Sequence, residues 1–253
     1  TVNRQILLFS QIKTRASTPS VLEFFAEYTE RAGKESWSFE RYLYELLNVE
    51  RENRNDRRIE KLLRESKLPL SKTLDTLDRT RFSRTINQQI DALIDGAFLG
   101  RSENILVFGN PGAGKSHTLC AIGHKLVRQG HRVLFKNCEI LVQELLSAKR
   151  EFVLPALLRK LARYEALIID DIGYVQQDRE EMEVLFTLLA DRYERSSTMI
   201  TSNLPFSGWE KIFKDPMTTA AAIDRLVHHS MILELNLSSY RLEEAKKEKN
   251  YER

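Results

Sequence analysis

An apolar run that leads into a glycine-rich turn decides the fold: Ile105-Leu106-Val107-Phe108-Gly109-Asn110-Pro111-Gly112-Ala113-Gly114-Lys115-Ser116. From Gly109 to Ser116 the residues match the pattern G-x-x-x-x-G-K-[ST] at every fixed position. The apolar run predicts a buried strand, and helical periodicity begins directly after the turn. A chance glycine-rich turn rarely combines the full pattern with both flanks. The stretch therefore predicts a P-loop between a strand and a helix.

The chemistry of a P-loop assigns a role to each of its residue types. Glycines let the backbone fold tightly, so that its N–H groups converge on phosphate oxygens, and the following helix adds the positive end of its dipole. We expect Lys115 to contact the β- and γ-phosphates and the Ser116 hydroxyl to bind Mg²⁺. The predicted ATP-binding residues are Gly109, Asn110, Pro111, Gly112, Ala113, Gly114, Lys115, Ser116 and His117.

A second apolar run ends in two adjacent carboxylates, Leu167-Ile168-Ile169-Asp170-Asp171. A P-loop needs an acidic group at the end of another buried strand to complete its magnesium site. We expect Asp170 to hold Mg²⁺ through water and Asp171 to orient or polarise the attacking water for an in-line displacement. The alternative is an aspartate pair that caps a helix or forms a turn, which the preceding apolar residues disfavour.

A third run, Thr198-Met199-Ile200-Thr201-Ser202-Asn203, also ends in polar residues. If this strand lies between the P-loop strand and the Asp170 strand, Asn203 points at the γ-phosphate and the attacking water. An amide at that position could detect hydrolysis. An asparagine just ahead of Pro205 is otherwise more often a loop residue, so this prediction depends on the order of the strands.

Strand-like runs alternate with helical segments from residue 104 onward. The expected helices between the strands include Ser116–Gln129 and Arg179–Arg195. The alternation predicts an α/β fold in which a parallel five-stranded sheet is flanked by helices. The expected strands are Ile105–Gly109, Arg132–Lys136, Ala166–Asp170, Thr198–Thr201 and Met231–Leu235.

The first 98 residues carry helical rather than strand periodicity. Ser36, ahead of Phe39, is expected to start one of the helices, and the helical region is expected to end near Lys67. We predict a small all-helical N-terminal domain over residues 1–70, which would bind DNA or self-associate. A linker and a helix over residues 71–98 would lead into an ATPase domain over residues 99–253.

Composition limits the other possibilities. The 253 residues are 42% hydrophobic, enough for a sizeable core, and their net charge is only +3, so any nucleic-acid binding must come from local clusters. Cys120 and Cys138 are too few for a disulfide framework or a four-ligand zinc site. His228 and His229 are not expected to bind a metal, because adjacent histidines point different ways and no third ligand is spaced for zinc. No apolar run could span a bilayer and no signal peptide is evident, so we expect a cytoplasmic protein.

Two basic clusters are candidates for contacts with DNA phosphates. The segment from Arg51 to Lys72 holds eight Lys or Arg and four Asp or Glu, a local balance of +4, and its bases fall on one broad helical face. A second cluster follows the second expected strand. An exposed helix with ion pairs such as Glu50–Arg54 and Glu60–Arg64 is the alternative for the first cluster. The candidate DNA-binding residues are Arg51, Arg54, Arg57, Arg58, Lys61, Arg64, Lys149 and Arg150.

Together, the P-loop, the apolar-Asp-Asp segment and the Thr-Ser-Asn segment resemble the AAA+ clade of helicase loaders and initiators that includes DnaC and DnaA. Further stretches look like IstB, the ATP-binding helper of insertion-sequence transposition, and the likeness runs from about Trp37 to Leu242. The resemblance implies an AAA+ fold without a C-terminal lid domain. The stretches that carry the likeness to IstB are Asp191–Glu194, Ile200–Phe206, Asp224–Leu226, His228–Ser230 and Ser239–Leu242.

The resemblance also implies roles for arginines. Arg225, in an Asp-Arg motif of the family, is expected to reach the γ-phosphate bound by a neighbouring subunit, and Arg241 matches the sensor 2 position. Arg192 and Arg195 are reserve candidates for the arginine that acts between subunits. The alternative for all four is a surface arginine in a solvated ion pair. Many relatives carry Glu where Asp171 stands, so the shorter carboxylate would slow turnover.

The leading hypothesis is an IstB-like, Mg²⁺-dependent ATPase that assembles on double-stranded target DNA as a homo-oligomer, with ATP sites shared between subunits. It would hold or deform the DNA and recruit a partner transposase, and hydrolysis would reset the complex. The first alternative is a DnaC-like loader that binds single strands and a replicative helicase. A small-molecule kinase and a switch that binds ATP but hardly hydrolyses it are further alternatives.

Overall fold

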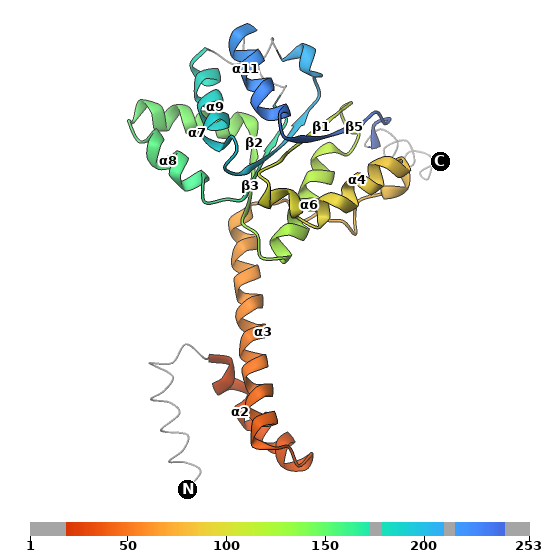
Figure 1. Cartoon of the computed structure of the whole chain (residues 1–253), viewed down its shortest axis with the longest axis vertical. Coiled ribbons are helices and arrows are strands. Elements are labelled where there is room, and N and C mark those ends of the chain that lie inside the picture. Colours follow the sequence, from red (N-terminus) through yellow and green to blue (C-terminus); the bar gives the residue numbers. More distant parts are fainter. Residues whose placement is uncertain (1–18, 173–178, 210–215, 241–253) are drawn as a thin grey trace, which may run out of the picture. The chain divides into compact units, whose positions relative to one another are not determined.

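The structure, a computed structural model, describes residues 19–172, 179–209 and 216–240 (Figure 1). The chain forms two compact units, Thr1–Lys61 and Leu62–Arg253, and the boundary falls within helix α3 (Phe39–Ser66). Leu62 and Leu68 belong to the hydrophobic core of the second unit, which places the structural boundary before residue 70. A functional division at residue 70 stays a prediction.

The described part of the first unit consists of α2 (Pro19–Lys34) and most of α3. The hydroxyl oxygen of Ser38 accepts a hydrogen bond from the backbone N–H of Arg41 at 3.2 Å, so Ser38 caps α3. The prediction that Ser36 starts this helix is wrong. Ser36 lies in the turn before the cap, in a left-handed backbone conformation with a φ of 49°.

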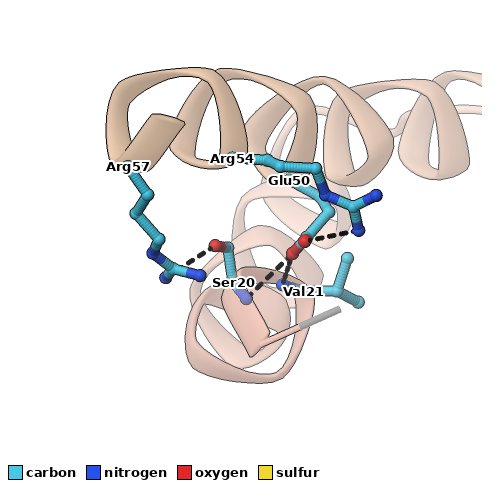
Figure 2. A network of polar contacts seen from close by, with 5 residues as sticks. All are labelled: Ser20, Val21, Glu50, Arg54 and Arg57. Atoms are coloured by element: carbon cyan, nitrogen blue, oxygen red, sulfur yellow. Dashed lines mark hydrogen bonds and ion pairs between the residues drawn. The ribbon is translucent and has the colours of Figure 1, made fainter. Parts of the chain in front are cut away.

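A carboxylate of α3 caps the start of α2, as Figure 2 shows. Glu50, whose side chain is 7% exposed, accepts hydrogen bonds from the backbone N–H groups of Ser20 and Val21 at 2.9 and 3.3 Å. Arg54 donates to the same carboxylate at 3.1 Å, and Arg57 donates to Ser20 Oγ at 3.2 Å. The first N–H groups of a helix lack partners within it, so this carboxylate satisfies them and complements the helix dipole.

The second unit is built on a five-stranded parallel sheet, with the strand order β2-β3-β4-β1-β5. Each strand lies within one residue of its predicted bounds, and the predicted α/β fold is confirmed. β4 pairs with both β1 and β3, which is the order on which the prediction for Asn203 depends. The strands are β1 (Asn104–Gly109), β2 (Val133–Asn137), β3 (Ala166–Asp170), β4 (Ser197–Ser202) and β5 (Ser230–Leu235).

Helices cover both faces of this sheet, with α4 and α6 on one face and α7, α8, α9 and α11 on the other (Figure 1). Successive side chains of β1 point to opposite faces, so Ile105 and Val107 join one core and Leu106 joins the other. Burial on both faces explains why the strands are continuous apolar runs in the sequence. The helices are α4 (Arg84–Ile94), α6 (Lys115–Arg128), α7 (Cys138–Arg150), α8 (Leu154–Leu161), α9 (Arg179–Arg192) and α11 (Pro216–Val227).

Three short elements complete the described part of the second unit: η1 (Arg79–Arg81), α5 (Ala97–Gly100) and η2 (Phe206–Gly208). η1 lies in the connection between α3 and α4, which is otherwise irregular from residue 67 to residue 83. Among the described residues, no helix combines the length and the apolar character needed to cross a bilayer.

Candidate nucleotide-binding site

A cavity of about 450 Å³ lies where β1, β3 and β4 end. It is lined by residues 111–117 after β1, by Asp171 after β3 and by Asn203 after β4. Parallel strands of an open sheet direct their carboxyl ends to one edge, where such sheets bind ligands. The structure therefore brings together the three motifs that the sequence placed far apart in the chain.

Two glycines of the P-loop occupy positions that exclude a side chain. Gly109 has a φ of 149°, and a Cβ there would lie 2.3 Å from the carbonyl oxygen of Leu235 in β5. Gly112 has a φ of 79°, and a Cβ there would lie 2.2 Å from Ser239 Oγ. The loop is thus confined between β5 and the segment that follows it, which fixes the directions of its N–H groups.

Lys115 is buried, and oxygen atoms surround its ammonium group. Nζ donates to the backbone carbonyls of Gly109 at 2.9 Å and Asn110 at 3.0 Å, and to Oδ1 of Asn203. Gly109 and Asn110, both predicted to bind ATP, thereby hold the lysine in place, while Lys115 itself lines the cavity. These contacts place one cation and one amide side by side between β1 and β4.

The acidic pair is held by a residue of the neighbouring strand. The Thr201 hydroxyl donates to Asp170 Oδ1 at 2.6 Å and accepts from the backbone N–H of Asp171 at 2.8 Å. Asp170 is buried, whereas Asp171 lines the cavity and has a left-handed backbone conformation, with a φ of 62°. Thr201 belongs to the polar cluster at the end of the third apolar run, and no motif gives it a role. The only signal in the sequence was its place at the polar end of an apolar run.

The residues present fit a magnesium–nucleotide complex. The confined glycine loop leads into the amino end of α6, a helix of 14 residues, where N–H groups and the helix dipole favour phosphate. Mg²⁺ prefers oxygen ligands and usually keeps several waters, so the Ser116 hydroxyl and the Asp170 carboxylate are a suitable donor set. Asp171 and Asn203 then flank the place where a terminal phosphate would lie.

One wall of this cavity was not predicted from the sequence. Arg81 and Phe82, from the connection before α4, line it together with Tyr240. The guanidinium carbon of Arg81 lies 5.2 Å from the centroid of the Tyr240 ring, and Arg81 donates to the backbone carbonyl of Ser238 at 2.9 Å. A planar guanidinium and an aromatic ring form a surface that suits a nucleobase. No motif marks these residues except the Ser-Tyr-Arg segment that contains Tyr240.

His117, in α6, contacts the connection between α3 and α4, which also contains Arg81 and Phe82. Its Nε2 lies 3.0 Å from Thr76 Oγ1 and 3.1 Å from the carbonyl oxygen of Thr73. Burial lowers the pKa of His117, which favours the neutral imidazole. His117 and Thr76 both line the cavity, and the contact of His117 with ATP stays a prediction.

Arg225 lies at the opposite edge of the sheet. It lines a second cavity, of about 130 Å³, beside Asn104 and His229, where β1 and β5 begin. Its guanidinium carbon lies 4.7 Å from the centroid of the Phe186 ring, and its Nη1 is buried without a hydrogen-bond partner among the described residues. β1 has six residues, so roughly 17 Å of strand separate the two edges. Arg225 cannot reach the P-loop of its own chain.

The other arginines differ in their surroundings. Arg192 is 1% exposed and donates to three backbone carbonyls at 2.7 to 3.1 Å, and burial lowers its pKa to about 10. Its proposed reserve role between subunits is wrong, because the fold uses its guanidinium to join α8 to β4. Arg195 is exposed and pairs with Asp191 at 3.6 Å. Arg241, the predicted sensor 2 residue, lies outside the described residues.

The basic residues of α3 are exposed, and two of them also stabilise the first unit. The ion pair Glu50–Arg54 is present at 3.1 Å, and Arg57 contacts Ser20, so Arg54 and Arg57 have structural contacts as well as solvent access. The six candidate DNA-binding residues of this helix are all exposed: Arg51, Arg54, Arg57, Arg58, Lys61 and Arg64.

The second basic cluster is partly neutralised by acidic residues. Lys149 pairs with Glu183 at 2.9 Å and Arg150 pairs with Glu180 at 3.4 Å, both across to α9. Exposed pairs of this kind are weak, so DNA phosphates could replace them. The local charge is nevertheless smaller than on α3, which makes α3 the stronger candidate for contacts with DNA.

The sequence of this chain is similar to a family of known proteins. Residues 14–248 match the family model described as IstB-like ATP binding protein. Over 234 residues the chain is 42% identical to a protein of Sinorhizobium fredii named as an insertion sequence ATP-binding protein, covering 92% of this chain and 78% of that relative. Over 219 residues it is 40% identical to a protein of Pseudomonas aeruginosa named as an ATP-binding protein of insertion sequence IS21, covering 86% of this chain and 82% of that relative.

Solved structures share the fold of the second unit. The DnaC helicase loader superposes with a TM-score of 0.56 at 18% identity, over 65% of this chain and 97% of the loader. AMPPCP-bound DnaA from Aquifex aeolicus also gives a TM-score of 0.56 at 18% identity, over 74% of this chain and 56% of that chain. At this identity the likeness establishes the AAA+ fold and leaves activity to be argued from the site.

Proposed function

Because the chain belongs to the IstB-like ATP-binding protein family, we propose that it is an ATPase that assembles on double-stranded target DNA and recruits the transposase of its insertion sequence. It is an ATP-binding AAA+ protein. In this proposal ATP binding drives self-assembly, two subunits share each ATP site, and hydrolysis resets the complex. The assembly would hold or deform the target DNA.

One observation carries the proposal of hydrolysis: Lys115, Asp171 and Asn203 line a single cavity. Lys115 would bind the β- and γ-phosphates, and Asn203, beside it, would orient the attacking water. The Asp171 carboxylate would polarise that water. Magnesium, held by Ser116 and Asp170, would neutralise charge that develops on the phosphates.

Arg225 supports the proposal that subunits share the ATP site. Its guanidinium is at the edge of the sheet opposite the P-loop, and its Nη1 has no hydrogen-bond partner among the described residues. Arg225 also lines the cavity at this edge, where an anionic phosphate of a neighbouring subunit would meet the guanidinium. An arginine supplied in this way can raise the rate of hydrolysis by about 10³–10⁵.

The exposed bases of α3 support the proposal of DNA binding. They can contact phosphates, which contribute affinity without sequence readout, and the first unit contains no base-reading motif among its described residues. We therefore expect binding to duplex DNA with weak sequence preference and strong dependence on salt.

Analytical ultracentrifugation with duplex DNA tests the proposal directly. ATP together with DNA should produce a large assembly, whereas ADP should leave smaller species. A monomer under both conditions would contradict shared ATP sites. Arg51→Gln combined with Arg58→Gln should weaken DNA binding, because both side chains are exposed on α3. Lys125→Gln combined with Arg128→Gln, which removes two exposed bases of α6, is the matched control.

Partner capture separates the proposal from the loader alternative. The full chain, assembled with ATP on duplex DNA, should retain the partner transposase. Retention of a replicative helicase on single-stranded DNA, with no retention of transposase, would favour a loader. Phosphate release measured with and without DNA tests the further alternative of a switch that binds ATP but hardly hydrolyses it.

A further inference from the structure

Two histidines and a glutamate converge at the amino edge of the sheet, away from the P-loop. Glu194 follows α9, and His228 and His229 lie between α11 and β5. One possible ligand atom from each side chain lies within 4.8 Å of the others, and all three side chains are exposed. The prediction that adjacent histidines diverge and lack a third ligand is therefore wrong.

The local backbone explains the convergence. α11 ends at Val227, so the two histidines lie beyond the helix, and their rings contact edge to face with centroids 4.2 Å apart. Glu194 adopts a left-handed conformation with a φ of 58°, which is uncommon outside glycine, in the turn between α9 and β4. This turn brings Glu194 to the histidines from a distant part of the sequence, which spacing along the chain could not reveal.

Tyr193 connects two of the three side chains. Its hydroxyl lies 3.0 Å from His228 Nδ1. The same hydroxyl forms a hydrogen bond with the Glu194 carboxylate. When the single phenol proton is donated to Glu194, the phenol oxygen accepts from Nδ1–H of His228, which leaves the lone pair on Nε2. Hydrogen bonds of this kind orient the histidines that bind metals in proteins.

We propose that Glu194, His228 and His229 form a binding site for a divalent transition-metal ion, with Zn²⁺ as the best match. Two imidazole nitrogens and one carboxylate oxygen are the ligand set of zinc sites that keep one position for water. Glu194 and His229 also line the cavity of about 130 Å³, which has room for that water.

Neighbouring charges are compatible with a cation at this position. Arg101 lines the cavity, but its guanidinium donates two hydrogen bonds to Glu103, at 2.7 and 2.9 Å. The guanidinium of Arg225 lies over the ring of Phe186, and the preceding residue in the chain, Asp224, adds an exposed carboxylate. A bound ion would join the turn after α9 to the segment after α11, three residues beyond Arg225. Any effect on Arg225 rests on the proposed function, whereas metal binding itself does not.

Calorimetric titration of the tag-free full chain with Zn²⁺, without nucleotide or DNA, tests the site. We expect one ion per chain, and Co²⁺ should give the absorption bands of a low-symmetry, four-coordinate site. His229→Gln and Glu194→Gln should each weaken Zn²⁺ binding at least about tenfold. Tyr193→Phe should weaken binding by about 10–100-fold, because it removes an outer-shell partner and leaves the ligands in place.

Two control variants make the result specific. His131 also contacts a glutamate, Glu165 at 2.9 Å, but belongs to no three-ligand cluster among the described residues, so His131→Gln should bind Zn²⁺ like the wild type. Asp170→Ala, which alters the magnesium site, should also bind Zn²⁺ normally. No stoichiometric Zn²⁺ binding, unchanged binding in His229→Gln, or loss of binding in Asp170→Ala would each overturn the proposal. Because nucleotide is absent, none of these outcomes bears on ATP hydrolysis.

Discussion

The two edges of the sheet differ in how completely one chain satisfies its own polar groups. At the carboxyl edge, Thr201 joins Asp170 to β4 and Asn203 contacts Lys115, so each group is already oriented. At the amino edge, Arg225 keeps a buried Nη1 without a partner among the described residues. One edge therefore has the oriented groups that bind nucleotide within a chain, whereas the other keeps an arginine that lines a cavity and that the described residues do not fully satisfy.

The largest expected effect comes from Arg225 at the amino edge of the sheet. Arg225→Ala should lower ATP hydrolysis in the DNA-bound assembly by about 10³-fold, because a neighbouring phosphate loses its arginine. Nucleotide affinity of the isolated chain should stay unchanged, since Arg225 lies far from its own P-loop. Phosphate release and fluorescent-nucleotide binding measure the two quantities. Arg195→Ala, which removes an exposed arginine paired with Asp191, is the control.

A mixing experiment sharpens this prediction. Arg225→Ala chains retain the P-loop, and Lys115→Ala chains retain the arginine, so a mixture should hydrolyse ATP faster than either variant alone. If Arg225→Ala instead lowers nucleotide affinity in the isolated chain, the two edges are coupled within one subunit and the comparison fails.

The next largest effect is expected at the carboxyl edge of the sheet, where Lys115 lies. Lys115→Ala should weaken ATP binding by about 100-fold, or about 2.7 kcal/mol, because it removes the cation that faces the phosphates. Equilibrium dialysis with labelled ATP measures this change in the isolated chain. Lys125→Ala, on the exposed side of the same helix, is the matched control and should bind ATP normally. Equal affinities for the two variants would remove Lys115 from the site.

A smaller effect should follow from Thr201→Val, which keeps the shape of the side chain but removes its hydroxyl. Asp170 and the backbone N–H of Asp171 then lose a shared partner, so hydrolysis should fall about tenfold while ATP affinity changes little. Steady-state kinetics separates the two quantities. Thr201→Ser restores the hydroxyl and should recover most of the rate. If serine fails to do so, packing rather than hydrogen bonding explains the loss.

The sequence predicted the carboxyl edge well because its chemistry is contained in short motifs. Gly109–Ser116 and Asp170 each follow an apolar run, and alternating strands and helices imply a parallel sheet whose ends meet. Strand order could not be derived from these patterns alone. The predicted position of Asn203 depended on that order and therefore needed the structure. Arg81 and Tyr240 could not be predicted as one wall, since an irregular connection and a distant segment bring them together.

The amino edge was harder to predict for the same physical reason. Glu194 reaches His228 and His229 through a left-handed turn, and no local pattern encodes which distant residues such a turn will meet. The burial of Arg192 was missed as well, because a charged residue is usually exposed unless the fold supplies several partners.

The smallest expected effect tests whether satisfied polar groups also stabilise the first unit. Glu50→Gln keeps one oxygen acceptor but removes the charge that faces the start of α2 and Arg54, which should cost about 1 kcal/mol. Hydrogen exchange of the Ser20 and Val21 amides in the full chain should therefore become faster. Glu52→Gln, at an exposed position of the same helix, is the matched control.

The same carboxylate predicts a dependence on pH. Burial alone would raise the pKa of Glu50, but the hydrogen bonds from Arg54, Ser20 and Val21 lower it below the usual value of 4.5. The folded protein thus binds the proton more weakly than the unfolded chain, so stabilisation is complete above pH about 4.5 and is lost as the pH falls through the lowered pKa. Protection of the Ser20 and Val21 amides, corrected for intrinsic exchange, should decrease in this acidic range in the wild type but much less in Glu50→Gln. An equal decrease in both proteins would mean that other carboxylates control the acid response. The cap on α2 would then make no measurable contribution to stability.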